Sequence, residues 1–228
     1  MKHLFMICLM AGITQANHAQ TVQVEAGVNC NCATNYKEAA TESWDNYFME
    51  ISSPDRVQTI DASLTFGLHA GVSVNWPLTG KWAFQPGIHF NMKGAKAEGT
   101  YGSGGSSTPF SQQDILTYID LVLAFQYWIN QQVYLELGPE LGFLVARKFK
   151  ETKGGVDYES SGTEDANTLH LGIGAGAGYM FGNSGFGVFA RYTRGLTKFE
   201  KAEPYYENVR TNAGQFGVFY RIPRKGKK

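Results

Sequence analysis

The chain has 228 residues, 20 of them basic and 20 acidic, and 27 are glycine. A balanced charge gives no electrostatic footprint for nucleic-acid binding, so we expect no nucleic-acid partner. The abundance of Gly, Phe and Tyr favours strands and tight turns over helix bundles.

Residues 1–19 have the pattern of a secretory signal peptide. Lys2 and His3 form a basic start, an apolar run follows, and Ala19 offers a small-residue cleavage point. The apolar run, 4–13, is too short to cross a bilayer, and no later run approaches eighteen apolar residues. The sequence therefore predicts an exported protein without a helical membrane anchor.

Cys30 and Cys32 follow in the first extended segment. The Cα atoms of residues i and i+2 in a strand lie about 6.5–7 Å apart, which suits a mutual disulfide poorly. We expect two small strand residues. A redox or intermolecular role is the alternative.

Eight segments alternate apolar and polar residues with a period of two, which predicts strands. They cover 22–30, 60–76, 82–93, 114–129, 133–145, 169–181, 186–193 and 214–222.

The connections between these segments alternate in length. Three are tight turns, at 77–80, 130–132 and 182–185. Four are long polar stretches, at 31–58, 97–113, 150–167 and 197–209. Short periplasmic turns with long outer loops are typical of outer-membrane barrels.

Residues 36–51 leave the two-residue period. Ala40, Trp44, Tyr47, Phe48 and Ile51 are spaced as one face of a helix. Asn35 with Glu38 resembles a capping box, and 52–54 supplies a stop.

A lone helix of this length must bury its apolar face against something. The barrel's rim or the outer leaflet is one choice. The other is a protein partner, with Trp44, Tyr47 and Phe48 as the possible loop contacts.

Glycine occupies every second position from Gly172 to Gly178, which differs from the dinucleotide fingerprint. The pattern predicts a bare inward face that leaves room for bulky groups such as Tyr134 or Phe189.

A soluble lipocalin-like barrel shares the alternation, with its apolar face inward. Three features favour a membrane barrel instead. The strands exceed the roughly 9–11 residues that cross a bilayer, the polar face is rich in Gly and small groups, and aromatic residues recur near the turns. These aromatic residues are Trp76, Trp82, Tyr127, Trp128, Phe181 and Tyr220.

The sequence thus predicts an all-β fold, an eight-stranded antiparallel up-and-down transmembrane β-barrel in the cell outer membrane. Residues 20–222 form the barrel domain, surrounded by outer-membrane lipid, and 223–228 form a basic periplasmic tail.

An eight-stranded barrel is just wide enough for its own side chains to fill it. Buried charges must be paired, so we expect Arg191 and Lys93 to meet carboxylates of Asp120, Glu136 and Glu140. Asp61 and Arg221 face the lumen in the same register. A structural polar plug is our interpretation, and a proton or ion path is the alternative.

Signatures of catalysis are missing from the sequence, including the Gly-x-Ser-x-Gly elbow and the His-Glu-x-x-His motif. His69, His89 and His170 face the lumen, each on a different strand, and we interpret them as polar interior residues rather than metal ligands. The sequence predicts no enzyme, and no catalytic, cofactor-binding or metal-binding residue.

Several strings resemble the PorT-like outer-membrane β-barrel family, over about 62–222. They are Gly67-Leu68-His69-Ala70-Gly71, Pro77-Leu78, Gln85-Pro86, Lys93-Gly94-Ala95-Lys96, Tyr118 to Leu123, Tyr134 to Gly142 and Phe186 to Leu196. The resemblance implies an eight-stranded barrel in a Gram-negative outer membrane, and the namesake takes part in assembling a protein-secretion system. No catalytic residue carries over, and the 223–228 tail departs from barrels that end on an aromatic residue.

The resulting function hypothesis is a non-enzymatic outer-membrane barrel with a filled lumen, whose outer loops contact a protein partner or a surface. The alternative is an accessory component of a protein-secretion or envelope-assembly machine. A small porin is disfavoured because eight strands leave no open channel.

Overall fold

The computed structural model describes residues 20–163, 166–198 and 209–222. The predicted signal peptide and basic tail lie outside the described residues, as does most of the expected stretch 197–209. The described part contains one helix and ten strands. They are β1 (Thr21–Thr34), α2 (Tyr36–Glu50), β2 (Arg56–Ser63), β3 (Thr65–Pro77), β4 (Trp82–Gly102), β5 (Thr108–Trp128), β6 (Val133–Lys153), β7 (Val156–Ser161), β8 (Leu169–Met180), β9 (Phe186–Gly195) and β10 (Arg210–Ile222).

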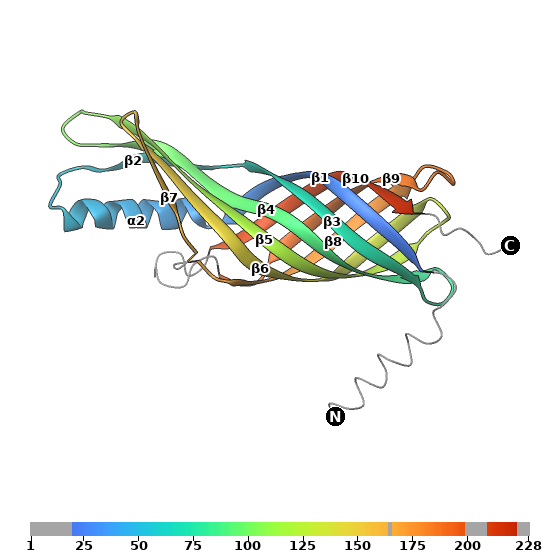
Figure 1. The fold of residues 1–228 in the computed structure, drawn as a ribbon. Coiled ribbons are helices and arrows are strands. Elements are labelled where there is room, and N and C mark those ends of the chain that lie inside the picture. The colour runs from blue at the N-terminus through green and yellow to red at the C-terminus, as the bar shows by residue number, and fades with distance from the viewer. Residues whose placement is uncertain (1–19, 164–165, 199–208, 223–228) are drawn as a thin grey trace, which may run out of the picture.

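Eight of the strands close into a ring (Figure 1). The order is β1-β3-β4-β5-β6-β8-β9-β10, and β10 pairs with β1 to complete the circle. Every neighbouring pair is antiparallel. The eight-stranded up-and-down barrel that the alternation predicted is therefore confirmed. The predicted strand 60–76 is split at Leu64 into β2 and β3.

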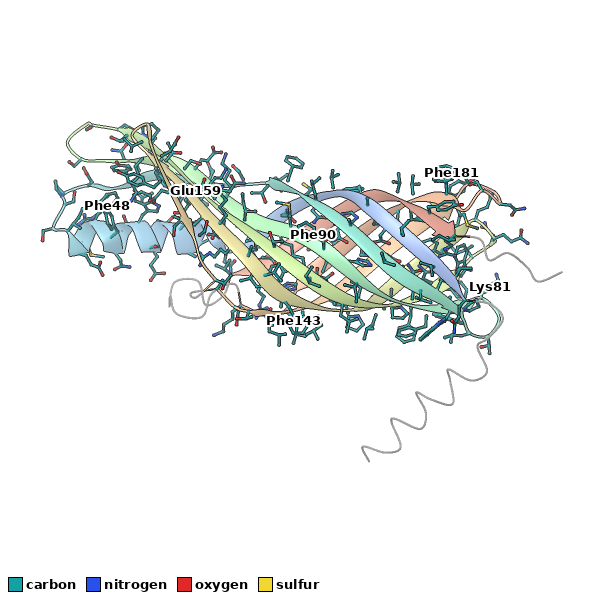
Figure 2. All side chains as sticks on the ribbon, viewed as in Figure 1. Phe48, Lys81, Phe90, Phe143, Glu159 and Phe181 are labelled. Carbon is teal, nitrogen blue, oxygen red and sulfur yellow. The ribbon has the colours of Figure 1, made fainter. Side chains whose placement is uncertain are left out.

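The wall of the barrel has an apolar outside and a polar inside. Along β9, exposed and buried residues alternate at every position. Phe143 and Phe181 extend outward from the wall in Figure 2 and are about half exposed, at 48% and 49%. The interior is lined by buried Gln, Asn, His and charged side chains instead. Within the described part of the chain, no helix has the length and hydropathy needed to cross a membrane.

The glycine face of β8 accommodates bulky neighbours. A Cβ added to Gly178 would lie 2.2 Å from the Tyr134 ring, and one on Gly174 or Gly176 would contact Arg191. The predicted room for Tyr134 is confirmed. Phe189 instead lies against Gly217 of β10.

Three tight turns gather at one end of the ring, which we call the turn end. Aromatic side chains ring the wall there, with Trp82 beside Tyr127 at 5.0 Å between centroids and Phe186 beside Tyr220 at 4.5 Å. Trp128 differs from the girdle we expected. Its ring turns inward and packs 5.0 Å from Tyr134, because it shares the inward parity of Gln126 on β5.

At the opposite, helix end, strands continue past the ring (Figure 1). β2 pairs with β4, β4 with β5, β5 with β6, and β6 with β7. We call this sheet the extension: β2, β7, and residues 96–102, 108–115 and 146–153 of β4, β5 and β6. The long connections expected at 97–113 and 150–167 lie beyond the ring, but both segments are mainly hairpin strands rather than irregular loops. Glycines with positive φ at Gly104, Gly105, Gly154 and Gly155 allow their tight tips.

The helix predicted over 36–51 is confirmed as α2, and it lies along the extension (Figure 1). Its start differs from the expected capping box. Asn35 adopts a left-handed conformation, with φ 57°, and its side chain caps no backbone N–H. A left-handed residue redirects the chain sharply from β1 into the helix.

The short turns predict that the turn end faces the periplasm and the helix end faces outward. In a Cys30→Ser, Cys32→Ser background, Ser106→Cys should react with an impermeant maleimide on intact cells, because it is exposed at a hairpin tip of the extension. Ser184→Cys, exposed at a tight turn, should react only after lysis. If Ser184→Cys, and not Ser106→Cys, were labelled on intact cells, the barrel would have the opposite orientation.

Candidate functional site

The molecule has two candidate functional regions, the lumen of the ring and the extension beyond it. The inward positions of the strands bring polar residues together inside the ring. The buried polar or charged residues there are Gln23, Glu25, Asn29, Asn31, Thr65, His69, Ser73, Asn75, Gln85, His89, Asn91, Lys93, Asp120, Gln126, Glu136, Glu140, His170, Arg191, Thr193, Thr211 and Gln215.

Arg221 and three aromatic rings close the lumen at the turn end. The guanidinium carbon lies 4.6 Å from the Trp128 ring centroid and 5.7 Å from that of Tyr134. Its Nε donates a hydrogen bond to Gln23 at 2.9 Å. Tyr134 also packs against Phe219, so this end is filled by ring and guanidinium stacking.

Arg191 is the cation at the centre of the lumen. Its Nε donates to Glu136 at 2.6 Å, and its Nη1 lies 3.3 Å from Glu25. A further bond from Nη1 reaches Gln215. One buried guanidinium therefore joins carboxylates from β6 and β1 across the barrel.

Lys93 is the second buried cation, nearer the helix end. Its ammonium group contacts Glu140 and lies 3.2 Å from Asp120. His170 Nδ1 lies 3.4 Å from the same nitrogen. The five charges that we expected in the lumen are thus buried and paired, and they form two clusters.

Amide side chains connect the two ion clusters. Gln215 accepts from Arg191 and donates to Asn91 at 3.0 Å, and Asn91 donates to Asp120 at 2.5 Å. An amide neither takes up nor releases a proton near neutral pH. This arrangement favours a structural plug over a proton path.

The acidic and imidazole groups of Asp120, Glu140 and His170 lie within 4.8 Å of one another. Such a set has metal-ligating chemistry, but the Lys93 ammonium already lies between the two carboxylates. A metal ion would have to displace a buried cation that is paired with both. The donor set therefore fits an ion-pair cluster.

The three inward histidines do not converge. His69 Nδ1 lies 2.8 Å from Asn29, His89 Nδ1 lies 3.4 Å from Glu25, and His170 Nε2 lies 3.1 Å from Thr211. His69 and His170 each hydrogen-bond a polar neighbour, as polar interior residues do, whereas His89 Nδ1 lies near Glu25 and makes no hydrogen bond within the described part of the chain.

Glu25 is an ion-pair partner that the sequence analysis missed. It occupies a polar position in the alternation of β1, and that position was the signal for it. Asp61, in contrast, was wrongly placed in the lumen. It lies on β2 in the extension, where its exposed carboxylate pairs with Lys37 of α2 at 3.0 Å.

The extension holds α2 through a buried aromatic cluster. Trp44 lies 4.5 Å from Phe110 and 5.6 Å from Tyr101 between ring centroids, and Phe48 lies 5.1 Å from Tyr101. The Lys153 ammonium, from β6, covers Trp44 at 4.4 Å. The apolar face of the helix is therefore covered by the chain's own sheet.

Polar contacts fix the orientation of the helix. Trp44 Nε1 donates to Gln112 at 2.9 Å, and the Tyr36 hydroxyl donates to Asp114 at 3.2 Å. Arg147 Nε donates to the other Asp114 oxygen at 2.8 Å. These buried bonds link α2 to β5 and β6.

The structure changes the set of possible loop contacts. Trp44 and Phe48 are only 4% and 3% exposed. They therefore hold α2 on the extension and are not accessible to a partner. Tyr47 is 44% exposed and stays available. The apolar face of α2 thus packs against the barrel's own extension rather than against a protein partner.

The model of one protein family, described as outer membrane protein beta-barrel domain, matches residues 15–200. No curated protein sequence matched the chain significantly.

Several solved structures are similar to the chain. Ail, the attachment invasion locus protein of Yersinia pestis, has 14% identity and a TM-score of 0.43, with 89% of this chain and 98% of that chain covered. The neisserial surface protein NspA has 14% identity and a TM-score of 0.40, covering 90% and 100%. The outer membrane protease OmpT of Escherichia coli has 10% identity and a TM-score of 0.39, covering 89% and 96%.

The central ion cluster predicts a strong effect of Arg191→Leu. This change leaves Glu25 and Glu136 buried without their cation, which costs on the order of 3–5 kcal/mol of unfolding free energy. Val188→Thr, on the outer face, should cost less. A urea titration measures the unfolding free energy of each variant, with the folded fraction read from the gel band that shifts on boiling. An equal loss of unfolding free energy in the two variants would contradict the assignment of the inner and outer faces.

The aromatic cluster predicts that Trp44→Ala releases α2 and leaves the ring folded. Removing a buried Trp costs about 3–5 kcal/mol, which exceeds what an isolated helix can supply. Limited chymotrypsin digestion should cut within 36–51 in this variant. Met49→Ala is the control because Met49 is 55% exposed, and equal protection of both variants would argue against docking through Trp44.

Proposed function

Since the chain belongs to the outer membrane protein beta-barrel domain family, we propose that it is a non-enzymatic outer-membrane protein whose extension is a rigid contact surface for a protein partner. The filled lumen supports this choice over a porin. Ion pairs and stacked rings occupy the interior of the ring from Arg221 to His170.

The single observation that carries the proposal is the folded, braced extension. Three strands run past the ring, two edge strands widen the sheet, and α2 is fixed to it by buried bonds. A sheet beyond the bilayer is not required for barrel closure. A rigid surface lowers the entropy cost of binding a partner.

The β7 edge is the accessible part of this surface. All six residues, Val156–Ser161, are exposed, and among the described strands β7 pairs with β6 alone. An exposed strand edge offers unpaired backbone groups to an added strand. Val156 and Tyr158 are 54% and 55% exposed and supply apolar contact area. Glu159, labelled in Figure 2, pairs with Lys148 at 2.5 Å.

Site-specific photo-cross-linking on intact cells tests the proposal. A photoreactive phenylalanine in place of Tyr158 should give a discrete protein adduct, because that side chain lies on the exposed edge. The same group in place of Val188, on the apolar wall, should give no such protein adduct. The same photoreactive group can also replace Tyr47, which is exposed on α2. Failure to obtain a protein adduct at both positions would contradict a protein partner at the extension.

A PorT-like role as an accessory component of a protein-secretion or envelope-assembly machine is the second candidate. The observation that favours it is that Lys93, Glu140 and Arg191, which pair inside the lumen, fall within the strings that carry the resemblance. Deletion of the gene should then lower a defined set of exported proteins. Unchanged export would contradict this second candidate and would leave the contact surface as the remaining proposal.

A further inference from the structure

One ionised side chain interrupts the apolar outer wall of the barrel. Between the aromatic turn end and Leu196, Arg194 of β9 is the charged residue that faces outward among the described wall positions. Its parity is that of Val188, Ala190 and Tyr192, which all face outward, while Arg191 and Thr193 are buried inside.

Arg194 lies within the apolar band rather than at its rim. Its cross-strand neighbours are Ile173 on β8 and Asn212 on β10. Exposed apolar residues lie beyond it towards the helix end, namely Leu196 on its own strand and Leu171 on β8. On the β8 side Arg194 is therefore bordered by apolar wall, whereas its neighbour on the β10 side is Asn212, whose amide donates to Thr34.

Arg210 lies next to this position. It is exposed on β10, two residues beyond Asn212 towards the helix end, and it has the same outward parity as Phe216 and Val218. A long side chain on Arg194 can extend towards the membrane surface, as arginines near the interface do. That direction would bring both guanidinium groups to the headgroup region.

These two arginines differ from the lumen cations in having no side-chain partner among the described residues. In the described ranges 20–163, 166–198 and 209–222, neither makes a side-chain hydrogen bond or ion pair, whereas Arg191 and Lys93 each meet two carboxylates. A charge on a lipid-facing surface is costly unless it finds an opposite charge. The planar fork of a guanidinium fits two phosphate oxygens at once.

We infer that Arg194 and Arg210 form a binding site for the phosphate-bearing headgroup of a lipid in the leaflet at the helix end, which is the outer leaflet in the predicted orientation. Tyr192, Ile173 and Phe216 supply the apolar surface for its acyl chains, with exposed fractions of 52%, 44% and 55%. A lipid fits better than free phosphate because Arg194 lies below Leu196 in the wall. The inference stands apart from the proposed function, which concerns the extension.

Native mass spectrometry of the full mature chain in detergent tests the site. The probes are phosphatidic acid and phosphatidylcholine with identical acyl chains. The wild-type chain should retain phosphatidic acid in preference, and Arg194→Gln with Arg210→Gln should weaken that retention about tenfold or more, since charge-assisted bonds are lost. Arg56→Gln is the matched control, because Arg56 is exposed on the extension and bonds to backbone oxygens of Ser53 and Asp55.

The heat-modifiable band of each variant verifies that the ring is folded. Equal retention by the double variant and the wild type, or an equal loss in Arg56→Gln, would overturn the site. Complete displacement of phosphatidic acid by millimolar inorganic phosphate would show a free-phosphate site and would overturn the assignment to a lipid.

Discussion

Hydrocarbon offers no partner to a backbone N–H or C=O group, so each such group inside a bilayer must be paired within the protein. The ring of eight antiparallel strands meets this constraint because β10 returns to β1 and leaves no edge. Closure at eight strands makes the interior narrow, and side chains must fill it and satisfy one another. The polar core, with Arg191 between Glu25 and Glu136, is a consequence of that closure.

The same constraint ends where the bilayer ends, and the chain changes character there. Within the ring, the inward face of β4 and β5 carries Lys93 and Asp120, whereas nearer the helix end it carries Ala97, Phe110 and Leu116. Beyond the bilayer an open sheet is allowed, and water-facing apolar residues need a cover. α2 supplies that cover through Trp44 and Phe48, which is why one stretch of the chain leaves the strand pattern.

The alternation predicted the ring and its faces because burial on one side of a strand imposes a period of two. The hairpins of the extension were not predicted because they are held by continuation of the ladders and by α2, and stretches such as 150–155 contain no apolar side chain that could show an alternation. The register error at Asp61 has the same origin, since β2 is separated from β3 at Leu64 and follows the extension. Ion-pair partners such as Glu25 were visible as polar positions, but their pairing across the barrel depends on strand stagger, which a sequence pattern does not contain.

The fate of cations therefore separates two environments in one wall. Inside the ring, Arg191 and Lys93 are held by carboxylates that no solvent replaces. On the outside, Arg194 is part of the same strand, three residues away from Arg191, yet it has no carboxylate within the described chain. Closure accounts for the first arrangement, because charges buried in a filled lumen must be paired. It does not require the second, since a leucine at 194 would satisfy the bilayer at lower cost. Barrel closure therefore gives no reason for the cation at Arg194. A ligand outside the protein gives one, and at this place on the outer wall that ligand is the phosphate-bearing headgroup of a lipid.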